Sequence, residues 1–320
     1  MGSKPAVRPP RLAPGSRIAL VAPSGPILER DELTRAAELC RELGHEPVPG
    51  ANIGRRYGYL AGQDAERLAD LNAALRDPAI DAVWCIRGGY GLTRILDQVD
   101  LSAVERRPKP LIGFSDVTAL LLAVTARTGV VTFHAPTARQ PMPAFSRRHF
   151  AEVLWLAEPA GVLERLQPPP DVMVPRSPRI VTLHGGRAEG PLVGGNLSLL
   201  QCLIGTPWLP DLDGALLFLE DVGEDLYRVD RMLSHLRLAG LLDRIAGLIV
   251  GQLTDMKKGT ADGALGFDEV LDHYVAPLGI PAAYGFPVGH VDEQWTLPIG
   301  VRARLDAGAG EVEILEAAVS

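Results

Sequence analysis

One serine stands where a polypeptide chain can present a nucleophile to a bound substrate. Ser115 lies in the segment G-F-S-D-V-T at 113–118, directly after an apolar run and directly before a run that favours a helix. A serine at such a junction presents its hydroxyl at the carboxyl edge of a parallel sheet, where open α/β sheets bind ligands. The backbone N–H groups at the start of the helix can hold an anion or a developing oxyanion there. The alternative interpretation is that Ser115 caps the helix and that Gly113 eases a turn.

Two loops with glycines follow successive apolar runs. The turn at Ser115 is similar to the nucleophile elbow of hydrolases, but Val117 stands where G-x-S-x-G has its second glycine. The other loop, R-G-G-Y-G at 87–91, allows the backbone to approach a ligand and to offer N–H donors. It lacks the G-x-G-x-x-G order of a dinucleotide site, and a plain tight turn is the alternative. Because both loops follow strands of one expected sheet, we predict that they are neighbours.

A serine nucleophile needs a general base. Of the seven histidines, His290 is favoured because it lies in a loop bracketed by Gly and Pro after an apolar run, and such loops often carry function. A structural histidine is the alternative. The other six are His45 and His149, expected to be solvated, His134, expected to line the site or to pack in the core, and His184, His235 and His273, which lack a distinctive context.

The base in turn needs an acid that orients it, and one apolar run ends in two carboxylates. The segment L-L-F-L-E-D-V at 216–222 places Glu220 and Asp221 at the end of an expected strand, where one of them could reach an imidazole. A buried carboxylate needs a partner, because unpaired burial is costly. The alternative is a surface ion pair of Glu220 with Arg228 or Arg231. The chain order of serine, acid and base also occurs in α/β hydrolases, and no H-E-x-x-H segment or Cys/His cluster supports a catalytic metal.

The elements that must position these residues alternate along the first half of the chain. Apolar runs predict strands at 17–22, 82–86, 111–114 and 130–134. Helical spacing predicts helices at 33–43 and 117–126, and one between them that Asp64 can cap and that ends before Pro78. This rhythm implies right-handed crossovers and a mostly parallel sheet covered on both faces. The fold class is therefore α/β, with an N-terminal domain like the Rossmann and flavodoxin folds.

The composition of the sequence changes after residue 157, where proline becomes frequent and no clear periodicity remains. Six prolines fall within 158–178, which predicts a linker at 158–179 between an N-terminal domain at 15–157 and a C-terminal domain at 180–320. The second domain is expected to be smaller and rich in β structure. Its predicted elements are strands at 216–219, 246–251 and 282–286, helices at 226–239 and 267–276, and a closing hairpin of 301–306 and 311–316.

Composition narrows the class of protein further. The chain has 320 residues, of which 47% are hydrophobic, and a formal net charge of −7, which excludes a disordered chain and argues against nucleic acid as the main partner. The sequence has no uninterrupted apolar run of about 18 residues, so it predicts no membrane-spanning helix. Residues 1–14 show no apolar signal core and are expected to form a loose tail. Cys40, Cys85 and Cys202 fit neither a disulfide framework nor a metal cluster. A cytoplasmic protein is expected.

Five segments along the chain occur in a recognisable order. They are R-G-G-Y-G at 87–91, G-F-S-D-V-T at 113–118, G-P-L-V-G-G-N-L at 190–197, L-E-D-V-G-E at 219–224, and G-F-P-V-G-H with T-L-P-I-G at 285–300. Together they resemble the serine LD-carboxypeptidase family, also called murein tetrapeptide carboxypeptidases, whose superfamily includes the microcin C self-immunity peptidases. The resemblance implies two domains with the active site between them. It also implies a cytoplasmic homodimer without metal or cofactor that acts on murein peptides in peptidoglycan recycling.

The resemblance also implies a role for each matching residue. It gives Ser115 as the nucleophile, Glu220 as the acid and His290 as the base. The oxyanion hole would consist of the backbone N–H of Asp116 and that of Gly89 or its neighbour Gly88. The family cleaves the bond between L-lysine or meso-diaminopimelate and a terminal D-alanine.

Charge and motif position suggest further residues that would hold the substrate. They are Arg87 and Arg228 for the leaving carboxylate, Tyr90 in the glycine loop, and Trp295 as an aromatic platform near the base, with ion pairing or packing as the alternatives. The segment F-H-A-P-T at 133–137 departs from the F-H-G-P-M of the family and could reshape one wall of the pocket. Two other functions stay open: a microcin-type peptidase that cuts a peptidyl-nucleotide conjugate, and a non-catalytic protein that binds a small anionic ligand.

Overall fold

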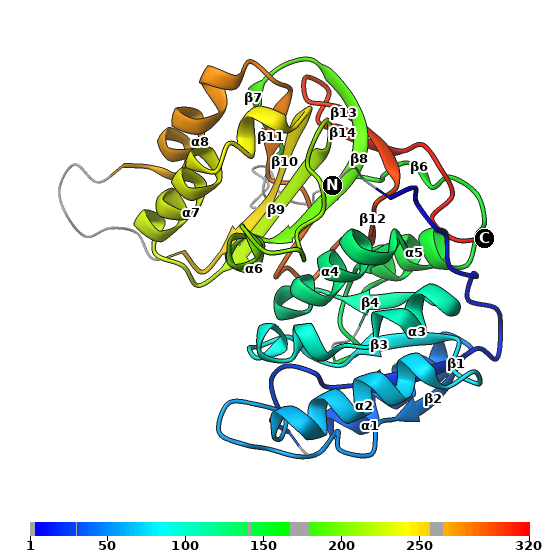
Figure 1. Cartoon of the computed structure of the whole chain (residues 1–320). Helices are drawn as coiled ribbons and strands as arrows, with labels where there is room; N and C mark the ends of the chain where they lie inside the picture. The colour runs from blue at the N-terminus through cyan, green and yellow to red at the C-terminus, as the bar shows by residue number, and fades with distance from the viewer. Residues whose placement is uncertain (1–3, 30, 140–141, 167–178, 257–264) are drawn as a thin grey trace, which may run out of the picture.

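Two β-sheets organise the chain, and each is built mainly from one half of it (Figure 1). The computed structural model describes residues 4–29, 31–139, 142–166, 179–256 and 265–320. One sheet has six strands in the order β12-β5-β4-β3-β1-β2, and the other has eight in the order β6-β14-β13-β8-β9-β10-β11-β7. These sheets, with their covering helices, confirm the predicted α/β class.

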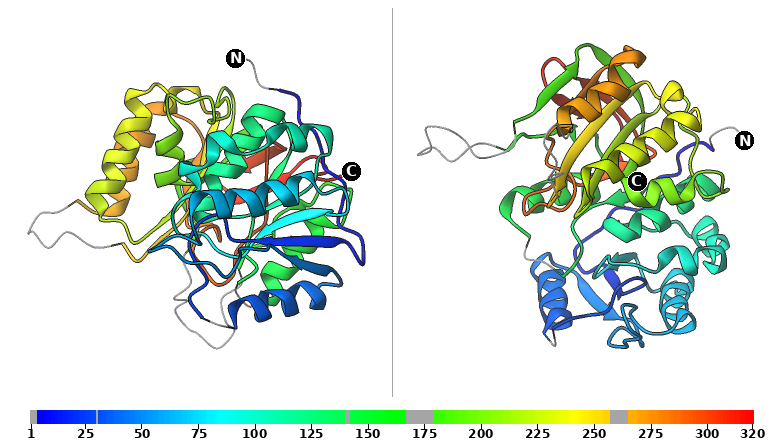
Figure 2. Two further views of the ribbon diagram at one scale, coloured as in Figure 1. Left: turned by 60° about the horizontal axis from the view of Figure 1, so that its bottom comes forward. Right: turned by 90° about the vertical axis from the view of Figure 1, so that its left-hand side faces the viewer.

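The first sheet follows the rhythm of strands and helices in the sequence. Its parallel strands are β1 (Arg17–Val21), β2 (Glu46–Pro49), β3 (Ala82–Cys85), β4 (Leu111–Gly113) and β5 (Thr132–His134). Its helices are α1 (Glu32–Glu42), α2 (Asp64–Arg76), α3 (Leu101–Arg106), α4 (Thr118–Thr128) and α5 (Ala144–Leu154). Helices lie on both faces of this sheet (Figure 2). The central strands are therefore buried along their whole length, as the continuous apolar runs indicated.

The second sheet is mixed. Its core consists of four parallel strands, namely β8 (Arg187–Asn196), β9 (Leu216–Val222), β10 (Gly247–Thr254) and β11 (Ala282–Tyr284). Antiparallel strands extend this core at both edges. One edge has β7 (Val181–His184), and the other has β13 (Arg302–Asp306), β14 (Glu311–Ile314) and β6 (Gly161–Val162). Its helices are α6 (Leu197–Leu203), α7 (Leu226–Leu238) and α8 (Phe267–Val275). The predicted closing hairpin is β13 with β14, and the two predicted helices are α7 and α8.

Two short strands join the halves of the chain. β12 (Leu297–Ile299) comes from the second half but pairs with β5 in the first sheet, in antiparallel register. The segment between β11 and β12 therefore passes from one sheet to the other. Of the predicted linker at 158–179, residues 167–178 lie outside the described part of the chain. Gly161 and Val162 form β6, so this part of the expected linker is a strand that pairs with β14.

Two expectations for the N-terminal half were wrong. Within the expected loose tail at 1–14, Val7 forms a bridge with Val130 and the side chain of Leu12 is buried, so this part of the tail packs on the domain. Asp64 does not cap α2. The cap is Gln63, and Asp64 is the first helical residue, where its carboxylate forms an ion pair with Arg94.

Two histidines that were expected to be solvated lie in the core instead. His45 and His149 are only 5% and 1% exposed. The sequence neighbours of His149 are charged, but its own face of α5 packs against Phe145 and Trp295, with ring centroids 4.6 and 6.3 Å away. Burial lowers the pKa of His149 to about 4.

Among the described helices, none is both long and apolar enough to cross a bilayer.

Candidate active site

The turn at Ser115 has a backbone conformation that is rare for serine. Its φ of 64° lies in the left-handed region, where a non-glycine residue is held at a cost of about 1–3 kcal/mol and is often functional. A short 3₁₀ turn over Ser115–Val117 connects β4 to α4. A Cβ on Gly113 would lie 2.9 Å from Cγ1 of Val117. Gly113 thus provides the space for Val117, the residue that departs from the hydrolase motif.

Three side chains from two sheets meet in a continuous chain of polar contacts. Nε2 of His290 lies 3.1 Å from Oγ of Ser115, and Nδ1 of the same ring lies 2.8 Å from Oε2 of Glu220. Ser115 follows β4 of the first sheet, Glu220 lies in β9 of the second, and His290 lies in the segment that crosses between them. These are the distances of hydrogen bonds, so the arrangement allows a proton to pass from the hydroxyl to the imidazole.

Glu220 is fully buried, whereas the side chain of His290 is 21% exposed. Burial raises the pKa of Glu220, and the hydrogen bond from His290 opposes that rise. The alternative of a surface ion pair was wrong. Arg228 is half exposed, and its acidic neighbours are Glu224 and Asp225 at the start of α7. Gly289 makes the approach to Glu220 possible, since a Cβ there would lie 2.6 Å from Oε2.

The glycine loop at 87–91 lies against the serine, as the sequence predicted. A Cβ on Gly88 would be 2.7 Å from Cβ of Ser115 and 3.4 Å from the backbone nitrogen of Asp116. Gly89 has a φ of 112°, which favours glycine. The carbonyl of Gly88 accepts a hydrogen bond of 2.9 Å from the N–H of Gly25, so a second loop supports the first.

The side chain of Asp116 has a contact that sequence reasoning missed. It is 1% exposed, and its Oδ2 accepts a hydrogen bond of 2.9 Å from the N–H of Leu92, just beyond the glycine loop. Burial raises the pKa of Asp116. The sequence assigned only the backbone N–H of this residue, because nothing in the local pattern shows that Leu92 approaches from 24 residues away.

A layer of aromatic rings lies behind the imidazole. The ring of Phe114 is 4.8 Å from that of His290 and 5.8 Å from that of His134, measured between centroids. His134 is fully buried, and burial lowers its pKa to about 3. Of the two expectations for His134, core packing is therefore the one observed. Ala135 and Thr137 are also buried, so the departure F-H-A-P-T changes packing in the interior.

The four candidate substrate-holding residues differ in their surroundings. The side chain of Arg87 is 22% exposed, with Nη1 4.0 Å from Oε1 of Glu32, and burial lowers its pKa. Tyr90 is 48% exposed and packs edge-to-face on Tyr59 at 5.6 Å. Arg228 takes part in the surface ion pairs described above. Arg87 and Tyr90 both belong to the loop that lies against Ser115, whereas Arg228 lies at the start of α7.

Of the two interpretations of Trp295, packing in the interior is the one observed, and an aromatic platform is not. This indole is 1% exposed, and its N–H donates a hydrogen bond of 2.7 Å to the carbonyl of Glu164. The ring also packs on Phe286 at 5.6 Å. A ring enclosed in this way offers no face to a ligand. No group of three or more His, Cys, Asp or Glu side chains within the described ranges is arranged to hold a metal.

Sequence relatives identify the family. The N-terminal domain of LD-carboxypeptidases matches residues 18–135, and the C-terminal domain matches residues 189–305. The chain belongs to the LD-carboxypeptidase family. A putative carboxypeptidase of Streptomyces coelicolor is 40% identical, over 96% of each chain. A probable murein peptide carboxypeptidase of Bacillus subtilis is 35% identical, over 98% of this chain and 95% of the relative.

Solved structures extend the comparison to the whole fold. The structure of the microcin C7 self-immunity protein MccF without ligand has a TM-score of 0.88 at 26% identity, and covers 98% of this chain and 100% of its own. A muramoyltetrapeptide carboxypeptidase from Oxalobacter formigenes has a TM-score of 0.80 at 31% identity, and covers 93% and 98%. The resemblance found in the sequence is thus confirmed, and a serine peptidase of the carboxypeptidase type is supported.

Proposed function

We propose that the protein is a serine LD-carboxypeptidase that releases the terminal D-alanine of murein tetrapeptides. The bond hydrolysed would join D-alanine to L-lysine or meso-diaminopimelate. The observation that carries the proposal is the continuous contact from Ser115 through His290 to the buried Glu220, at 3.1 and 2.8 Å. The murein peptide carboxypeptidases among the relatives supply the substrate class.

The mechanism follows from the roles of these groups. His290 accepts the proton of Ser115 as Oγ attacks the peptide carbonyl, and Glu220 orients the imidazole and stabilises its charged form. The N–H groups of Asp116 and of Gly88 or Gly89 stabilise the tetrahedral oxyanion. D-alanine leaves with the proton from His290, and an acyl-enzyme forms at Oγ. Water then attacks the ester with His290 again as the base.

Arg87 is our candidate for the group that holds the leaving carboxylate. It follows β3 directly, its neighbour Gly88 touches Ser115, and within the described residues its Nη1 is buried without a hydrogen-bond partner. A guanidinium suits the planar carboxylate of D-alanine. The same proposal includes a cytoplasmic homodimer that serves peptidoglycan recycling.

A second candidate function is the cleavage of a peptidyl-nucleotide conjugate. The observation that favours it is the fit of the whole chain to MccF, of which structures exist in complex with aspartyl sulfamoyl adenosine and glutamyl sulfamoyl guanosine. The burial of Trp295 removes the aromatic platform that the sequence suggested for a nucleobase. We therefore place this function second.

The deciding experiment measures free D-alanine released from murein tetrapeptides that end in L-lysyl- or meso-diaminopimelyl-D-alanine, with a chelator present. We expect release by the wild type and none by Ser115→Ala. Absence of release by the wild type would overturn the proposed substrate, and the same preparation would then be tested on aspartyl sulfamoyl adenosine. Cleavage of that compound alone would establish the second function.

The three contacting side chains should differ in how much activity their loss removes. We expect Ser115→Ala and His290→Ala to lower kcat by about 10³-fold or more, and Glu220→Gln somewhat less, because the imidazole remains in place. Steady-state kinetics with the tetrapeptide provide the measurement. Ser102→Ala, on the exposed start of α3, is the control. A Ser115→Ala enzyme with most of its activity would contradict the mechanism.

A further inference from the structure

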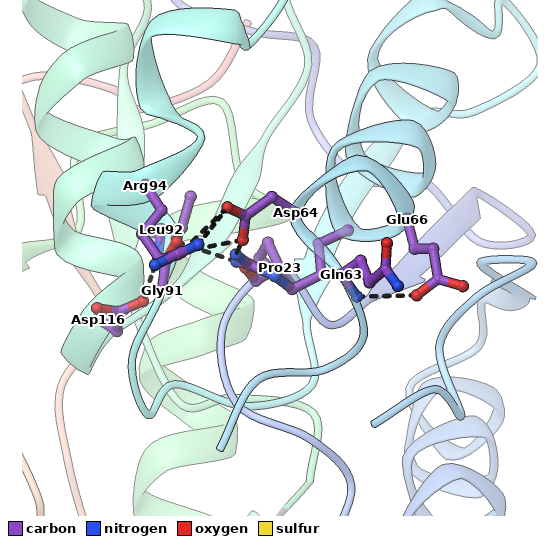
Figure 3. A network of polar contacts seen from close by, with 9 residues as sticks. Pro23, Gln63, Asp64, Glu66, Gly91, Leu92, Arg94 and Asp116 are labelled. Atoms are coloured by element: carbon purple, nitrogen blue, oxygen red, sulfur yellow. Dashed lines mark hydrogen bonds and ion pairs between the residues drawn. The ribbon is translucent and has the colours of Figure 1, made fainter. Parts of the chain in front are cut away.

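A buried polar network connects the nucleophile turn to the glycine loop (Figure 3). The N–H of Leu92 donates to Oδ2 of Asp116 at 2.9 Å. Nη1 of Arg67 donates to the carbonyl of Gly91 at 3.0 Å. The carbonyl of Gly91 and the N–H of Leu92 belong to the same peptide group. That single peptide group is therefore held from both ends, by the residue after the nucleophile and by an arginine of α2.

Arg67 joins three segments of the first sheet. Its side chain is fully buried, which is costly for a guanidinium unless acceptors surround it. Besides the carbonyl of Gly91, its acceptors are the carbonyl of Pro23 in the loop after β1 and the carboxylate of Asp64 at the start of α2. Asp64 also accepts a hydrogen bond of 2.7 Å from Arg94 (Figure 3). The carboxyl end of the glycine loop is thus tied to the loop after β1 and to the start of α2.

The amino end of the loop is fixed as well. Gly88 contacts Ser115 and accepts the hydrogen bond from Gly25, two residues after the Pro23 that Arg67 holds. At the other end, a Cβ on Gly91 would lie 2.6 Å from Cδ2 of Leu60 and 2.9 Å from Nη1 of Arg67. The backbone between these anchors contains Gly88 and Gly89, the proposed second donors of the oxyanion hole.

We propose that Arg67 and the carboxylate of Asp116 are positioning residues of the oxyanion hole. By holding the Gly91–Leu92 peptide between them, they fix the glycine loop relative to the N–H of Asp116. An oxyanion hole works only when its donors lie about 2.7–3.1 Å from the developing charge, and a displacement of about 1 Å can cost about 10²-fold in rate. The inference rests on the serine chemistry of the proposed function, and neither side chain contacts the reacting atoms.

The test uses two readouts on Arg67→Met, Asp116→Ala and the double variant. The first is the rate at which a fluorophosphonate labels Ser115, because its phosphoryl oxygen needs the same donors. The second is kcat and KM for D-alanine release. We expect each single variant to lose about 10- to 100-fold in labelling rate and in kcat, with KM within about threefold. The double variant should be no worse than the more damaging single variant, because both act on one peptide group.

Two conservative variants separate positioning from folding. Asp116→Asn keeps an oxygen that can accept from Leu92, and we expect it to retain activity within about fivefold of the wild type. Arg67→Lys keeps one cationic donor for the buried carbonyls, so it should retain more activity than Arg67→Met. Circular dichroism would verify that each variant is folded. Loss by Asp116→Asn equal to that by Asp116→Ala would count against a role through the accepted hydrogen bond.

Lys109 provides a matched control at the opposite end of α2. It is also fully buried, and its Nζ donates to the carbonyls of Ala74 and Asp77, at 3.0 Å each. Lys109→Met should lower the melting temperature without changing the labelling rate. Labelling rates of Arg67→Met and Asp116→Ala within twofold of the wild type, or losses that multiply in the double variant, would overturn the proposal. A wild type that is labelled but releases no D-alanine would reject the substrate alone.

Discussion

At the scale of single residues, three glycines are as important to the candidate site as its polar side chains, because a glycine has no Cβ. Gly113 leaves room for Val117, Gly88 leaves room for Ser115, and Gly289 leaves room for the carboxylate of Glu220. Each of these glycines therefore lets the backbone lie closer to its neighbour, Val117, Ser115 or Glu220, than any other residue would allow.

Gly88→Ala tests this close approach directly. The added methyl would lie 2.7 Å from Cβ and 2.9 Å from Oγ of Ser115, so we expect kcat to fall by about 10-fold or more as the loop is displaced. Gly185→Ala is the matched control, because a Cβ there meets nothing within 4 Å. Kinetics with the tetrapeptide and melting temperatures of both variants provide the measurement. Equal activity of the two variants would show that the loop at 87–91 can accommodate the added methyl group without a loss of kcat.

The residues of the site could be predicted from sequence to different degrees. Ser115 and Glu220 each end an apolar run, and His290 follows one, so local patterns pointed to all three. The geometry places these candidates within hydrogen-bonding distance, and their roles stay a proposal. Arg67 and the carboxylate of Asp116 gave no such signal, because their partners come from remote loops.

At the scale of elements, the end of β8 connects the second sheet to the start of α4, the helix that follows Ser115. The backbone N–H of Asn196 donates to Oγ1 of Thr118 at 3.1 Å, at the start of α4. Asn196 also pairs in the second sheet with Glu220, and its side chain donates to Asp221 at 3.0 Å. Three of the five recognisable segments therefore meet here, and their contacts connect the turn at Ser115 to the strand that carries Glu220.

Gly195→Ala should disturb this junction. Gly195 has a φ of 140°, and a Cβ there would lie 2.6 Å from Cγ2 of Thr118. We expect the variant to lose about 1–3 kcal/mol in free energy of unfolding, measured by urea titration, together with kcat. Thr118→Val keeps the shape and removes only the hydrogen-bond acceptor, so its loss should be about 1 kcal/mol. Unchanged kcat in Gly195→Ala would show that the junction does not set the geometry of the site.

Elements differed in how well the sequence predicted them. Strands β1, β3 and β4 are continuous apolar runs and were predicted nearly to the residue. β12 was missed because it is three residues long and contains Pro298. Proline is tolerated there because β12 is an edge strand, where a missing N–H breaks no ladder. Its pairing with β5 depends on a long-range crossing that no local pattern shows.

At the scale of the whole molecule, the interior holds uncharged histidines. His45, His134 and His149 are at most 5% exposed, and burial lowers the pKa of each, to about 3 for His134 and about 4 for His149. An unfolded chain binds a proton at a histidine near pH 6.5, whereas the folded chain resists it. The unfolded state therefore binds more protons in this range, and stability rises with pH.

We accordingly expect the free energy of unfolding to fall as the pH drops from about 6.5 towards 4. Each such histidine contributes up to about 1.4 kcal/mol per pH unit between its two pKa values. Urea titrations at pH 7, 6 and 5 provide the measurement, and His149→Leu should reduce the slope. His184→Leu, on the exposed strand β7, is the control. Equal slopes for wild type and His149→Leu would remove His149 from the explanation.

The crossing of β12 has a consequence for recombination between relatives. A chimaera that took its first half from one relative and its second half from another would receive the edge strand of its first sheet from the wrong parent. The same exchange would replace His290 and Glu220 while leaving Ser115 behind. Neither the first sheet nor the candidate site is therefore complete in one half of the chain. A chimaera that folds and is active must preserve both the β5–β12 pairing and the contact between His290 and Ser115.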